Sequence, residues 1–474
     1  MAPPSRPADM LHALGIAAPA GMPDALTGIT ADSRAVRPGM LYAALPGTHH
    51  DGRAFIADAV ARGAAAVLAP SGTVWPDAVP ARPLILDPEP RRALARLAAL
   101  QAGPQPATII AVTGTNGKTS TVEFVRQILT NTGQRAASLG TLGVIAPGER
   151  GGAGLTTPDP VTLAETLARL ARDGVTAAAI EASSHGLAQY RLDGVRLSAA
   201  GFTNLTRDHM DYHGTLGAYR DAKLRLFREL LPDGAPRVAM ADLDPETLAA
   251  CNAQTVGVNG TLIRLVNVTP HPGGQTLDLD FGGGRHRVTL SLPGRFQADN
   301  ALLAAGLAMV TGTTDAVLRL PQLTGVRGRM ELAAEPSGAA VYVDYAHTPD
   351  ALTRLIAALR PHTTGRLHLV FGAGGDRDRG KRPLMGQAAR DADRVTVTDD
   401  NPRSEPPASI RAAILAACPG AREIGDRAAA IGAALHDLRP GDVLAIAGKG
   451  HEQGQTIGTE TIPFDDVQTV RRLL

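Results

Sequence analysis

The sequence predicts an α/β protein built on mostly parallel sheets. Short apolar runs rich in β-branched residues recur along the chain, and segments with helical spacing of apolar residues separate them. This alternation is typical of βαβ units. Polar clusters follow several of the runs directly, at the positions where open parallel sheets bind their ligands. A length of 474 residues is enough for about three domains.

Two breaks in the sequence predict the domain boundaries. Gly103–Pro106 is rich in Pro and Gly, and Gly325–Arg329 interrupts the pattern a second time. We therefore expect a small N-terminal α/β domain over residues 1–103, a central domain with a mostly parallel sheet over 104–327, and a Rossmann-like C-terminal domain over 328–474.

The same patterns place the individual elements. In the first domain we expect strands at Leu41–Gly47 and Ala65–Leu68 and a helix at Asp51–Arg62. In the central domain we expect strands at Ala107–Val112, Ala177–Ile180 and Val238–Ala241, helices at Leu163–Arg172 and Tyr219–Leu230, and an antiparallel insertion at Leu262–Leu292. In the last domain we expect strands at Val341–Tyr345, Leu367–Phe371, Arg394–Thr398 and Val443–Ala447, with helices between them.

Composition argues against several classes of protein. The formal net charge is +1 and no run of Lys and Arg occurs, so a nucleic-acid partner is not expected. Cys251 and Cys418 lack the spacing of a zinc site or a disulfide framework. The N-terminal segment has no apolar core of a signal peptide, and no stretch of about 18 apolar residues occurs. We therefore expect a cytoplasmic protein that does not interact with a membrane.

The run Gly114–Ser120 predicts a phosphate-binding loop. It follows an apolar strand and precedes apolar residues at helical spacing, so backbone N–H groups, the helix dipole and the Lys118 ammonium would converge on one anion. The Thr119 hydroxyl would reach the magnesium ion of a nucleoside triphosphate. Val112 stands where the common P-loop has glycine, so this loop is a shorter variant. The alternative is an ordinary turn at a helix start.

Two further strands of the central domain end in polar clusters. Glu181–His185 follows one strand and Asn204–His213 follows another. A carboxylate and an imidazole at these positions could bind a divalent metal close to the triphosphate. A lone Glu or His at such a place is better explained as part of a solvated loop. Two clusters at neighbouring strand ends make a site about as good an explanation as two solvated loops.

Strands of the last domain also end in polar clusters, at Gly372–Arg382, Asp399–Arg403 and Gly448–Glu452. Guanidinium groups at strand ends are suited to holding a carboxylate or a phosphate. A second nucleotide site in this domain is a competing interpretation, because Gly-rich turns after strands serve that purpose too.

Taken together, these strings resemble the Mur ligase family of cell-wall peptide synthetases, and most closely the members that add the third residue of the stem peptide. The residues that carry the resemblance are Asp32–Arg34, Thr113–Thr119, Thr156–Pro158, Glu181–His185 with Gln189 and Arg191, Asn204–His213, Asp344–Asp350, Gly372–Arg382, Asp400–Arg403 and Gly448–Glu452.

The resemblance implies a reaction and its partners. Family members use ATP and Mg²⁺ to form an acyl phosphate on their UDP-linked substrate, and an incoming amine then displaces phosphate. For this chain it implies UDP-N-acetylmuramoyl-L-alanyl-D-glutamate and meso-diaminopimelate as substrates, and a monomer as the active form. The three domains would bind the UDP-linked substrate, ATP and the amino acid, respectively.

The resemblance also implies roles for individual residues. The catalytic residues would be Lys118, Glu181, His209 and Lys223. The metal ligands would be Thr119, Glu181, His209 and Lys223, the last as a carbamate. ATP would contact Gly114, Thr115, Asn116, Gly117, Lys118, Thr119, Ser120, Asn300, Arg329 and His347. The UDP-linked substrate would contact Ala31, Ser33, Thr48, His49, His50, Thr156, Thr157, Ser183, Gln189 and Arg191. Diaminopimelate would contact Arg377, Asp400, Asn401, Pro402, Arg403, Gly448 and Glu452.

Charge favours diaminopimelate over lysine as the third amino acid. Diaminopimelate carries a second carboxylate at the far end of its side chain, and Arg403, with Arg377 as a second fork, could hold it. Glu452 would meet the distal ammonium. A lysine-adding ligase, a folylpolyglutamate synthetase and a P-loop ATPase with a binding module remain as alternatives.

Overall fold

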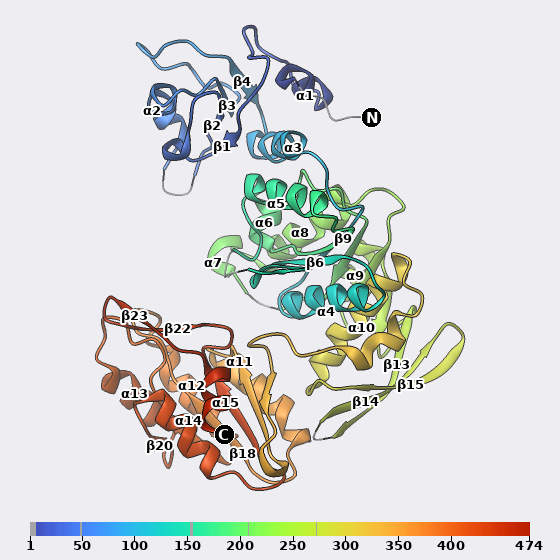
Figure 1. The fold of residues 1–474 in the computed structure, drawn as a ribbon, viewed down its shortest axis with the longest axis vertical. Coiled ribbons are helices and arrows are strands. Elements are labelled where there is room, and N and C mark those ends of the chain that lie inside the picture. Colours follow the sequence, from blue (N-terminus) through green and yellow to red (C-terminus); the bar gives the residue numbers. More distant parts are fainter. Residues whose placement is uncertain (1–5, 48–49, 152–154, 207, 272) are drawn as a thin grey trace. The chain divides into compact units, whose positions relative to one another are not determined.

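The computed structural model describes residues 6–474, apart from 48–49, 152–154, 207 and 272 (Figure 1). The chain divides into two compact units, Met1–Gln254 with Leu307–Thr314, and Thr255–Gly306 with Asp315–Leu474. Each unit is an α/β structure, as the alternation of strand and helix patterns predicts. Along the described residues, no helix is both long enough and apolar enough to cross a membrane.

The N-terminal part of the first unit carries a parallel sheet of four strands in the order β1-β2-β3-β4. The strands are β1 (Ile29–Thr30), β2 (Leu41–Ala43), β3 (Ala66–Pro70) and β4 (Leu84–Asp87). The helices are α1 (Pro7–Ala13), α2 (Ile56–Ala61) and α3 (Pro90–Ala102), with short 3₁₀ turns at Ser33–Ala35 and Gly52–Phe55. Alternate strand residues face two separate apolar clusters, so both faces of the sheet are covered.

A larger sheet follows in the same unit, in the order β11-β10-β5-β9-β6-β7-β8. The strands are β5 (Thr108–Thr113), β6 (Ala136–Gly140), β7 (Gly143–Ala146), β8 (Glu149–Arg150), β9 (Ala177–Glu181), β10 (Ala199–Phe202) and β11 (Arg237–Met240). The helices are α4 (Lys118–Asn131), α5 (Pro160–Arg172), α6 (Ser184–Ala188), α7 (Met210–His213), α8 (Leu216–Arg225) and α9 (Pro245–Cys251). The strands from β11 to β6 are parallel, so the ends of β5, β9 and β10 lie at one edge.

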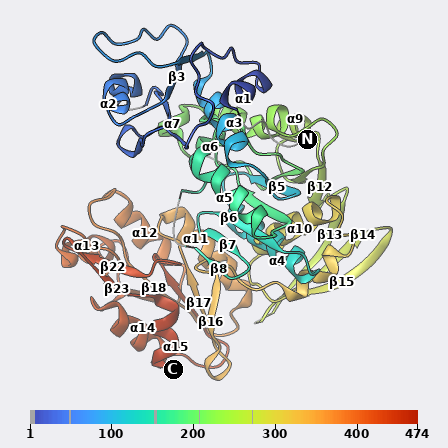
Figure 2. The same cartoon turned by 45° about the horizontal axis from the view of Figure 1, so that its top comes forward.

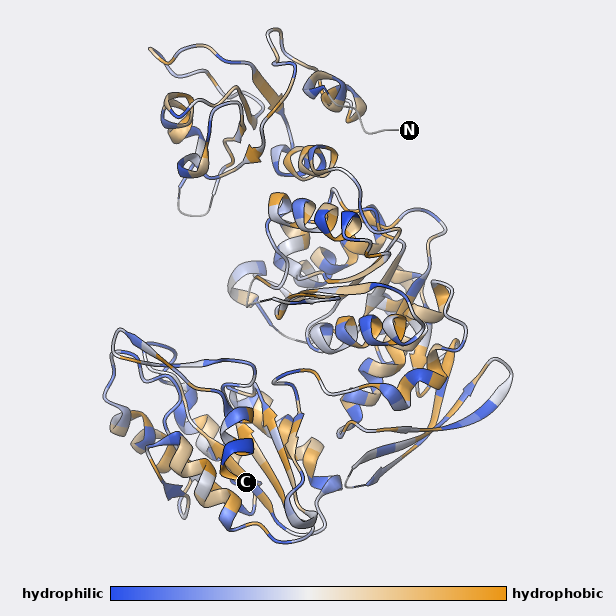
Figure 3. Ribbon diagram, viewed as in Figure 1, coloured by the Kyte–Doolittle hydropathy of each residue, from blue (hydrophilic) through white to orange (hydrophobic). Residues whose placement is uncertain are grey.

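The second unit contains β12 (Gln254–Gly257, which starts at the division), β13 (Ile263–His271), β14 (Gly274–Phe281) and β15 (Gly284–Leu290). β13, β14 and β15 pair in antiparallel fashion, which confirms the predicted insertion at Leu262–Leu292. Figure 3 shows many hydrophilic residues on these three strands and hydrophobic residues concentrated in the other sheets. α10 (Arg295–Val310) and a 3₁₀ segment at Ala316–Gln322 follow.

A six-stranded sheet in the order β16-β17-β21-β18-β19-β20 completes the second unit. Its strands are β16 (Glu331–Ala334), β17 (Ala340–Asp344), β18 (Leu367–Phe371), β19 (Arg394–Val397), β20 (Arg422–Glu423) and β21 (Val443–Ala447), of which β16 alone among them is antiparallel. The helices are α11 (Pro349–Leu359), α12 (Lys381–Ala389), α13 (Pro407–Leu415), α14 (Arg427–His436) and α15 (Asp466–Leu473). A hairpin of β22 (Gly454–Ile457) and β23 (Glu460–Pro463) precedes α15.

Alternation along the strands explains the layers of this sheet. Tyr342, Leu369 and Ala445 belong to one apolar cluster, whereas their neighbours Val343, Val370 and Ile446 belong to another. Because successive side chains of a strand point to opposite faces, the two clusters lie on opposite sides of the sheet. Figure 2 shows β17 and β18 between α11 and α12 on one side and α14 and α15 on the other. This doubly wound arrangement is the one predicted for the C-terminal domain.

Some predicted elements differ in their bounds. The helix expected at Asp51–Arg62 starts as a 3₁₀ turn at Gly52–Phe55, capped by the Asp51 side chain, and only then becomes α2. The helix expected at Tyr219–Leu230 begins earlier, at Leu216, because Thr215 caps it, and it ends in a π-helical turn. β2 is shorter than expected: it ends at Ala43, and Pro46 then pairs with Asp51 in an isolated bridge.

A buried ion pair attaches the last helix to the second unit. The Arg427 guanidinium donates to both oxygens of Asp466 at 2.7 Å, and neither side chain is exposed to solvent. The same guanidinium donates to the Ala447 carbonyl at the end of β21, at 3.0 Å. Arg427 begins α14 and Asp466 begins α15, so one bidentate contact joins two helix starts to a strand end.

We expect Asp466→Ala to destabilise the protein by about 3–5 kcal/mol, because it leaves a buried guanidinium without its counter-charge. Urea unfolding followed by circular dichroism measures the change. The control is Asp350→Ala, which removes the exposed pair between Asp350 and Arg354 and is expected to cost about 0–1 kcal/mol. Equal unfolding midpoints for the two variants would contradict the expectation.

Candidate functional site

The predicted phosphate loop adopts a backbone that requires glycine at two positions. Gly114 has a φ of +137°, and a Cβ there would lie 1.9 Å from the Thr203 hydroxyl. Gly117 has a φ of +83° at the N-cap of α4, where no side chain caps the helix. The carboxyl end of β5 therefore meets an uncapped helix start, whose N–H groups suit an anion.

The loop after β10 holds the phosphate loop in place. Thr203 Oγ1 donates to the Asn116 carbonyl at 2.6 Å, and Asn204 Oδ1 accepts from Asn116 N at 3.0 Å. Thr115 Oγ1 donates to the Thr206 carbonyl at 3.1 Å and accepts from Thr206 N at 2.9 Å. The predicted phosphate loop and the polar segment that follows β10 are thus joined at one edge of the sheet.

Two lysines converge on this loop. Lys118 Nζ donates to the carbonyls of Gly114 at 3.0 Å and Thr115 at 2.8 Å, and Lys223 Nζ donates to the Gly114 carbonyl at 2.7 Å. Lys223 comes from α8, is 1% exposed, and lies 4.3 Å from the centre of the Tyr219 ring. Burial, with a smaller contribution from the Lys118 charge, lowers the pKa of Lys223 to about 6. At neutral pH its amine is therefore mostly uncharged.

Glu181 is held inside the same edge of the sheet. It ends β9, is 2% exposed, and its carboxylate accepts from Thr141 N at 2.8 Å and from Thr141 Oγ1 at 3.3 Å. A Cβ at Gly140 would lie 2.1 Å from Glu181 Oε1, so glycine is required there to leave room for the carboxylate.

Three residues predicted to contact the UDP-linked substrate lie around Glu181. Thr157 Oγ1 donates to the Glu181 carbonyl at 2.8 Å and accepts from Ser183 N at 3.0 Å. Thr156 Oγ1 lies 3.1 Å from Thr141 Oγ1, the hydroxyl that also reaches the Glu181 carboxylate. The predicted substrate contacts and the predicted metal ligand are therefore parts of one hydrogen-bonded cluster.

A cavity of about 470 Å³ adjoins this cluster in the first unit. Its lining includes Ala31, Gln189 and Arg191, which were predicted to contact the UDP-linked substrate, and also Arg91, which was not. Arg191 Nη1 donates to the Thr157 carbonyl at 2.6 Å, and Arg191 Nη2 donates to Gln189 Oε1 at 2.7 Å. The volume lies in the range of ligand pockets.

The remaining predicted contacts of the UDP-linked substrate are less informative. Ser33 is buried and follows Asp32, a residue of the cavity lining. His50 is exposed, with its ring 6.3 Å from that of Phe55. Thr48 and His49 lie outside the described residues. The roles of these four residues stay predictions.

The predicted metal ligands come from separate segments of the first unit, and their role as ligands stays a prediction. His209 has a φ of +53°, and its ring lies 4.8 Å from the ring of His185 and 6.2 Å from that of Tyr219. Across the described residues, no group of three or more His, Cys, Asp and Glu could hold a metal ion. The expected set contains two residues of these types, Glu181 and His209, together with Thr119 and a modified Lys223.

Three predicted ATP contacts belong to the second unit and are linked there. Asn300 donates to Gln297, whose amide donates to the Arg329 carbonyl, each at 3.4 Å. The Arg329 guanidinium lies 5.0 Å from the centre of the Tyr345 ring, and that ring lies 4.6 Å from the His347 ring. Asn300, Arg329 and His347 therefore belong to one chain of contacts. Their contact with a nucleotide stays a prediction.

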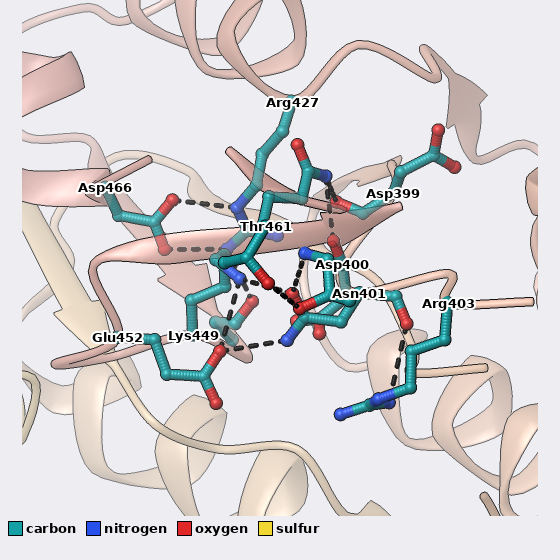
Figure 4. A network of polar contacts seen from close by, with 12 residues as sticks. Asp399, Asp400, Asn401, Arg403, Arg427, Lys449, Glu452, Thr461 and Asp466 are labelled. Atoms are coloured by element: carbon teal, nitrogen blue, oxygen red, sulfur yellow. Dashed lines mark hydrogen bonds and ion pairs between the residues drawn. The ribbon is translucent and has the colours of Figure 1, made fainter. Parts of the chain in front are cut away.

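The predicted amino-acid contacts form a polar network at the carboxyl ends of β19 and β21 (Figure 4). Asn401 Nδ2 donates to Glu452 Oε2 at 2.9 Å. Gly448 has a φ of +116°, and a Cβ there would lie 2.6 Å from Asp400 Oδ2. Only glycine leaves room for this close approach of the two strand ends.

The two predicted arginines flank one glycine. A Cβ at Gly374 would lie 2.9 Å from Arg403 Nη1 and 3.8 Å from Arg377 Cγ. Arg403 has a φ of +50°, an uncommon conformation for a residue with a side chain, and its Nη1 donates to the Gly375 carbonyl at 2.8 Å. A Cβ at Gly375 would in turn lie 1.9 Å from the Pro402 carbonyl. Arg403 Nη1 also lies 3.5 Å from the Asn401 carbonyl, so the guanidinium contacts the backbone of another predicted amino-acid contact.

Sequence reasoning missed several residues that hold the predicted ones. Thr141 fixes the Glu181 carboxylate, Tyr345 joins Arg329 to His347, and Lys449 is fully buried between Asn401 and Glu452. Thr141 lies outside every string that the sequence singled out. Tyr345 and Lys449 lie within Asp344–Asp350 and Gly448–Glu452 but received no role there, although Lys449 stands out because only four of the 47 Lys and Arg residues are lysines.

Comparison with known proteins agrees with this arrangement. Residues 25–101 match the model of the Mur ligase family catalytic domain, residues 112–308 the Mur ligase middle domain, and residues 328–450 the Mur ligase glutamate ligase domain. The chain is 55% identical over 459 residues to a UDP-N-acetylmuramoyl-L-alanyl-D-glutamate–2,6-diaminopimelate ligase of Caulobacter vibrioides, covering 93% of this chain and 94% of the relative. Identity to the protein of the same name from Rhizobium meliloti is 53%, covering 94% of both.

A solved structure with that name is also similar. It shares 36% sequence identity and a TM-score of 0.72, with 95% of each chain covered. The chain has a three-domain architecture and an uncapped helix start like that of a P-loop, and it matches relatives over nearly their whole length. It therefore belongs to the Mur ligase family, whose members use ATP.

Proposed function

We propose that the chain is an ATP-dependent ligase that joins meso-diaminopimelate to the D-glutamate of UDP-N-acetylmuramoyl-L-alanyl-D-glutamate in peptidoglycan synthesis. One observation carries the choice of amino acid. Arg403 Nη1 donates to the Asn401 carbonyl at 3.5 Å, and Asn401 Nδ2 donates to Glu452 Oε2 at 2.9 Å, so one residue contacts both a cation and a carboxylate. This pair matches the far end of diaminopimelate, which bears one ammonium and one carboxylate. Lysine would leave the guanidinium unpaired.

The first step joins two anions, the D-glutamate carboxylate and the terminal phosphate of ATP. A carboxylate oxygen attacks the γ-phosphorus, and the bond between that phosphorus and the bridging oxygen to the β-phosphate breaks. ADP is released, and the D-glutamate carboxylate becomes an acyl phosphate. The uncapped start of α4 and the Lys118 ammonium would hold the phosphates and offset the repulsion between the two reactants. The amino group of diaminopimelate then attacks the acyl carbon, phosphate leaves, and the nitrogen loses one proton.

The residues present fit a magnesium ion. Glu181 supplies a buried carboxylate, Thr119 a hydroxyl at the helix start and His209 an imidazole, and a carbamate on Lys223 would add an oxygen ligand. When bound, Mg²⁺ would withdraw charge from the phosphate oxygens. The domain bounds 1–103, 104–327 and 328–474 would then separate the sites for the UDP-linked substrate, ATP and the amino acid. Because ATP is cytoplasmic, the proposal places the protein there.

Lys223 has the properties that carbamate formation requires. Its uncharged amine can attack carbon dioxide, which forms an N–C bond and releases a proton from nitrogen. Burial lowers the pKa of Lys223 to about 6, so the reactive amine predominates above that pH. The product replaces an uncharged amine near Lys118 with an anion. An ammonium and an anion then lie near Gly114 as a pair of opposite charges.

We expect Lys118→Ala to lower kcat/KM by on the order of 10³-fold, because the ammonium at the phosphates is lost. A phosphate-release assay with ATP, the UDP-linked dipeptide and diaminopimelate measures it. Omitting either co-substrate should stop phosphate release, whereas an ATPase with a separate binding module would continue. A melting temperature equal to that of the wild type is the control, and a variant that keeps more than about a tenth of the activity would contradict the role.

We expect Lys223 to carry a carbamate that disappears as the pH falls through about 6, where protonation removes the attacking lone pair. With ¹³C-labelled bicarbonate, the wild type should show one carbamate carbon by NMR. Lys223→Ala should lack it and should regain part of its activity with a small carboxylate. Lys381→Ala is the matched control and should keep the signal. A signal that survives in Lys223→Ala would refute the assignment.

We expect diaminopimelate to be preferred over lysine by roughly 30- to 4,000-fold in kcat/KM, which corresponds to roughly 2–5 kcal/mol for an unpaired guanidinium. Arg403→Ala should lose most of this preference by reacting more slowly with diaminopimelate. Equal kcat/KM values for the two amino acids in the wild type would instead favour a lysine-adding ligase. Full discrimination by Arg403→Ala would place the specificity elsewhere, with Arg377→Ala as the next variant.

A further inference from the structure

Lysine is rare in this chain, and its positions are informative. Four of the 47 Lys and Arg residues are lysines, namely Lys118, Lys223, Lys381 and Lys449. Arginine therefore serves nearly everywhere that a cation is needed. A lysine that persists against such a bias indicates a position where a guanidinium does not fit. Lys118 and Lys223 have roles in the proposal above, whereas Lys449 does not.

Lys449 points into the protein because glycines flank it. Gly448 has a φ of +116° and Gly450 a φ of +53°, so the chain turns sharply on both sides after β21. The Lys449 side chain is 0% exposed. A bare ammonium at such a position needs several acceptors to offset its desolvation.

The ammonium finds its acceptors in two predicted amino-acid contacts. Lys449 Nζ donates to Asn401 Oδ1 at 3.0 Å and lies 3.2 Å from Glu452 Oε2 (Figure 4). Asn401 Oδ1 also accepts from Thr456 N at 2.9 Å, so its amide can have only one orientation. The Asn401 Nδ2 group then donates to Glu452 Oε2 at 2.9 Å.

Both donors reach the same oxygen of Glu452. Oε2 accepts hydrogen bonds from Lys449 Nζ and Asn401 Nδ2, whereas no group in the described part of the chain donates a hydrogen bond to Oε1. The Glu452 side chain is 34% exposed, so Oε1 is accessible. One oxygen of this carboxylate is fixed and the other can accept an N–H group of a ligand.

We infer that Lys449 is a positioning residue: its buried ammonium fixes Asn401 and one oxygen of Glu452 so that the other oxygen faces the distal ammonium of the amino-acid substrate. The inference rests on the proposed function, because it assumes a substrate with an ammonium at that place. A compact ammonium can donate to two acceptors inside a closed space. The broader, planar guanidinium would displace one of them.

Lys449→Met tests the inference by removing the charge while keeping most of the volume. The KM for meso-diaminopimelate should rise by about ten- to a hundredfold, because Glu452 becomes free to turn away. The KM values for ATP and for the UDP-linked dipeptide should stay within about twofold. Lys449→Arg should not restore the wild-type KM. Equal increases for all three substrates, or full rescue by arginine, would overturn the inference.

A double-mutant cycle separates positioning from independent contact. If Lys449 acts through Glu452, then Glu452→Gln and the double variant Lys449→Met/Glu452→Gln should differ by less than about twofold in KM for diaminopimelate. This comparison stands even if Lys449→Met alone does not fold, because the double variant buries no unpaired charge. A further tenfold loss in the double variant would refute the inference.

The matched control is His368→Gln. His368 is also buried in this unit, and its Nε2 lies 3.2 Å from Asp442 Oδ2, at the opposite end of β21 from Lys449. This variant should lower the melting temperature without a selective rise in the KM for diaminopimelate. The same selective rise in His368→Gln would show that loss of any buried pair has this effect. If the wild type itself did not ligate diaminopimelate, the proposed function would fail before the variants were compared.

Discussion

Charge held out of water at the ends of parallel strands is the constraint on which the rest of this structure depends. Glu181, Lys223 and Lys449 are all nearly or fully buried. Burying a bare charge costs several kcal/mol, so each needs partners supplied by neighbouring segments. Glu181 finds them in Thr141, Lys223 in the Gly114 carbonyl, and Lys449 in Asn401 and Glu452. These contacts in turn dictate where glycine must stand.

Glycine at Gly114, Gly140 and Gly448 makes these approaches possible. A Cβ would lie 1.9 Å from Thr203 Oγ1 at the first position, 2.1 Å from Glu181 Oε1 at the second and 2.6 Å from Asp400 Oδ2 at the third. In each case the atom in the way belongs to a polar group at a strand end. The glycines of the motifs are therefore needed less for flexibility than to let polar groups from two segments come within hydrogen-bonding distance.

The sequence was most informative where the pattern is local. Apolar runs such as Leu367–Phe371 and Val443–Ala447 predicted strands with the bounds that the structure has. Such a strand is buried on both faces, so nearly every residue along it is apolar and the apolar run ends where the strand ends. Bounds were missed where a side chain caps the helix, as Thr215 does for α8, and where an apolar run continues past the end of its strand, as it does after Ala43 in β2. Single polar residues of that kind are common, so no pattern distinguishes the ones that act.

The candidate site was predicted as separate strings, and the structure shows which of them meet. Thr157 and Ser183 meet at Glu181, and Asn401 meets Glu452. The network behind each predicted residue was not visible, because Thr141 contacts Glu181 and Tyr345 contacts Arg329, residues far away in the sequence that no local pattern links to them. The proposed metal set is a different case: it would depend on a modification of Lys223, which neither spacing nor unmodified side chains can reveal.

Composition supplies the remaining link between sequence and site. In a chain whose cationic residues are nearly all arginines, a lysine is informative where the chemistry of an ammonium differs from that of a guanidinium. Lys223 can lose its proton and react as an amine, which arginine cannot do. Lys449 places a point charge where two acceptors lie close together. The reactivity of its amine explains Lys223, and the small size of its ammonium explains Lys449. The scarcity of lysine in this chain therefore points to two positions where arginine would not serve, each for a different physical reason.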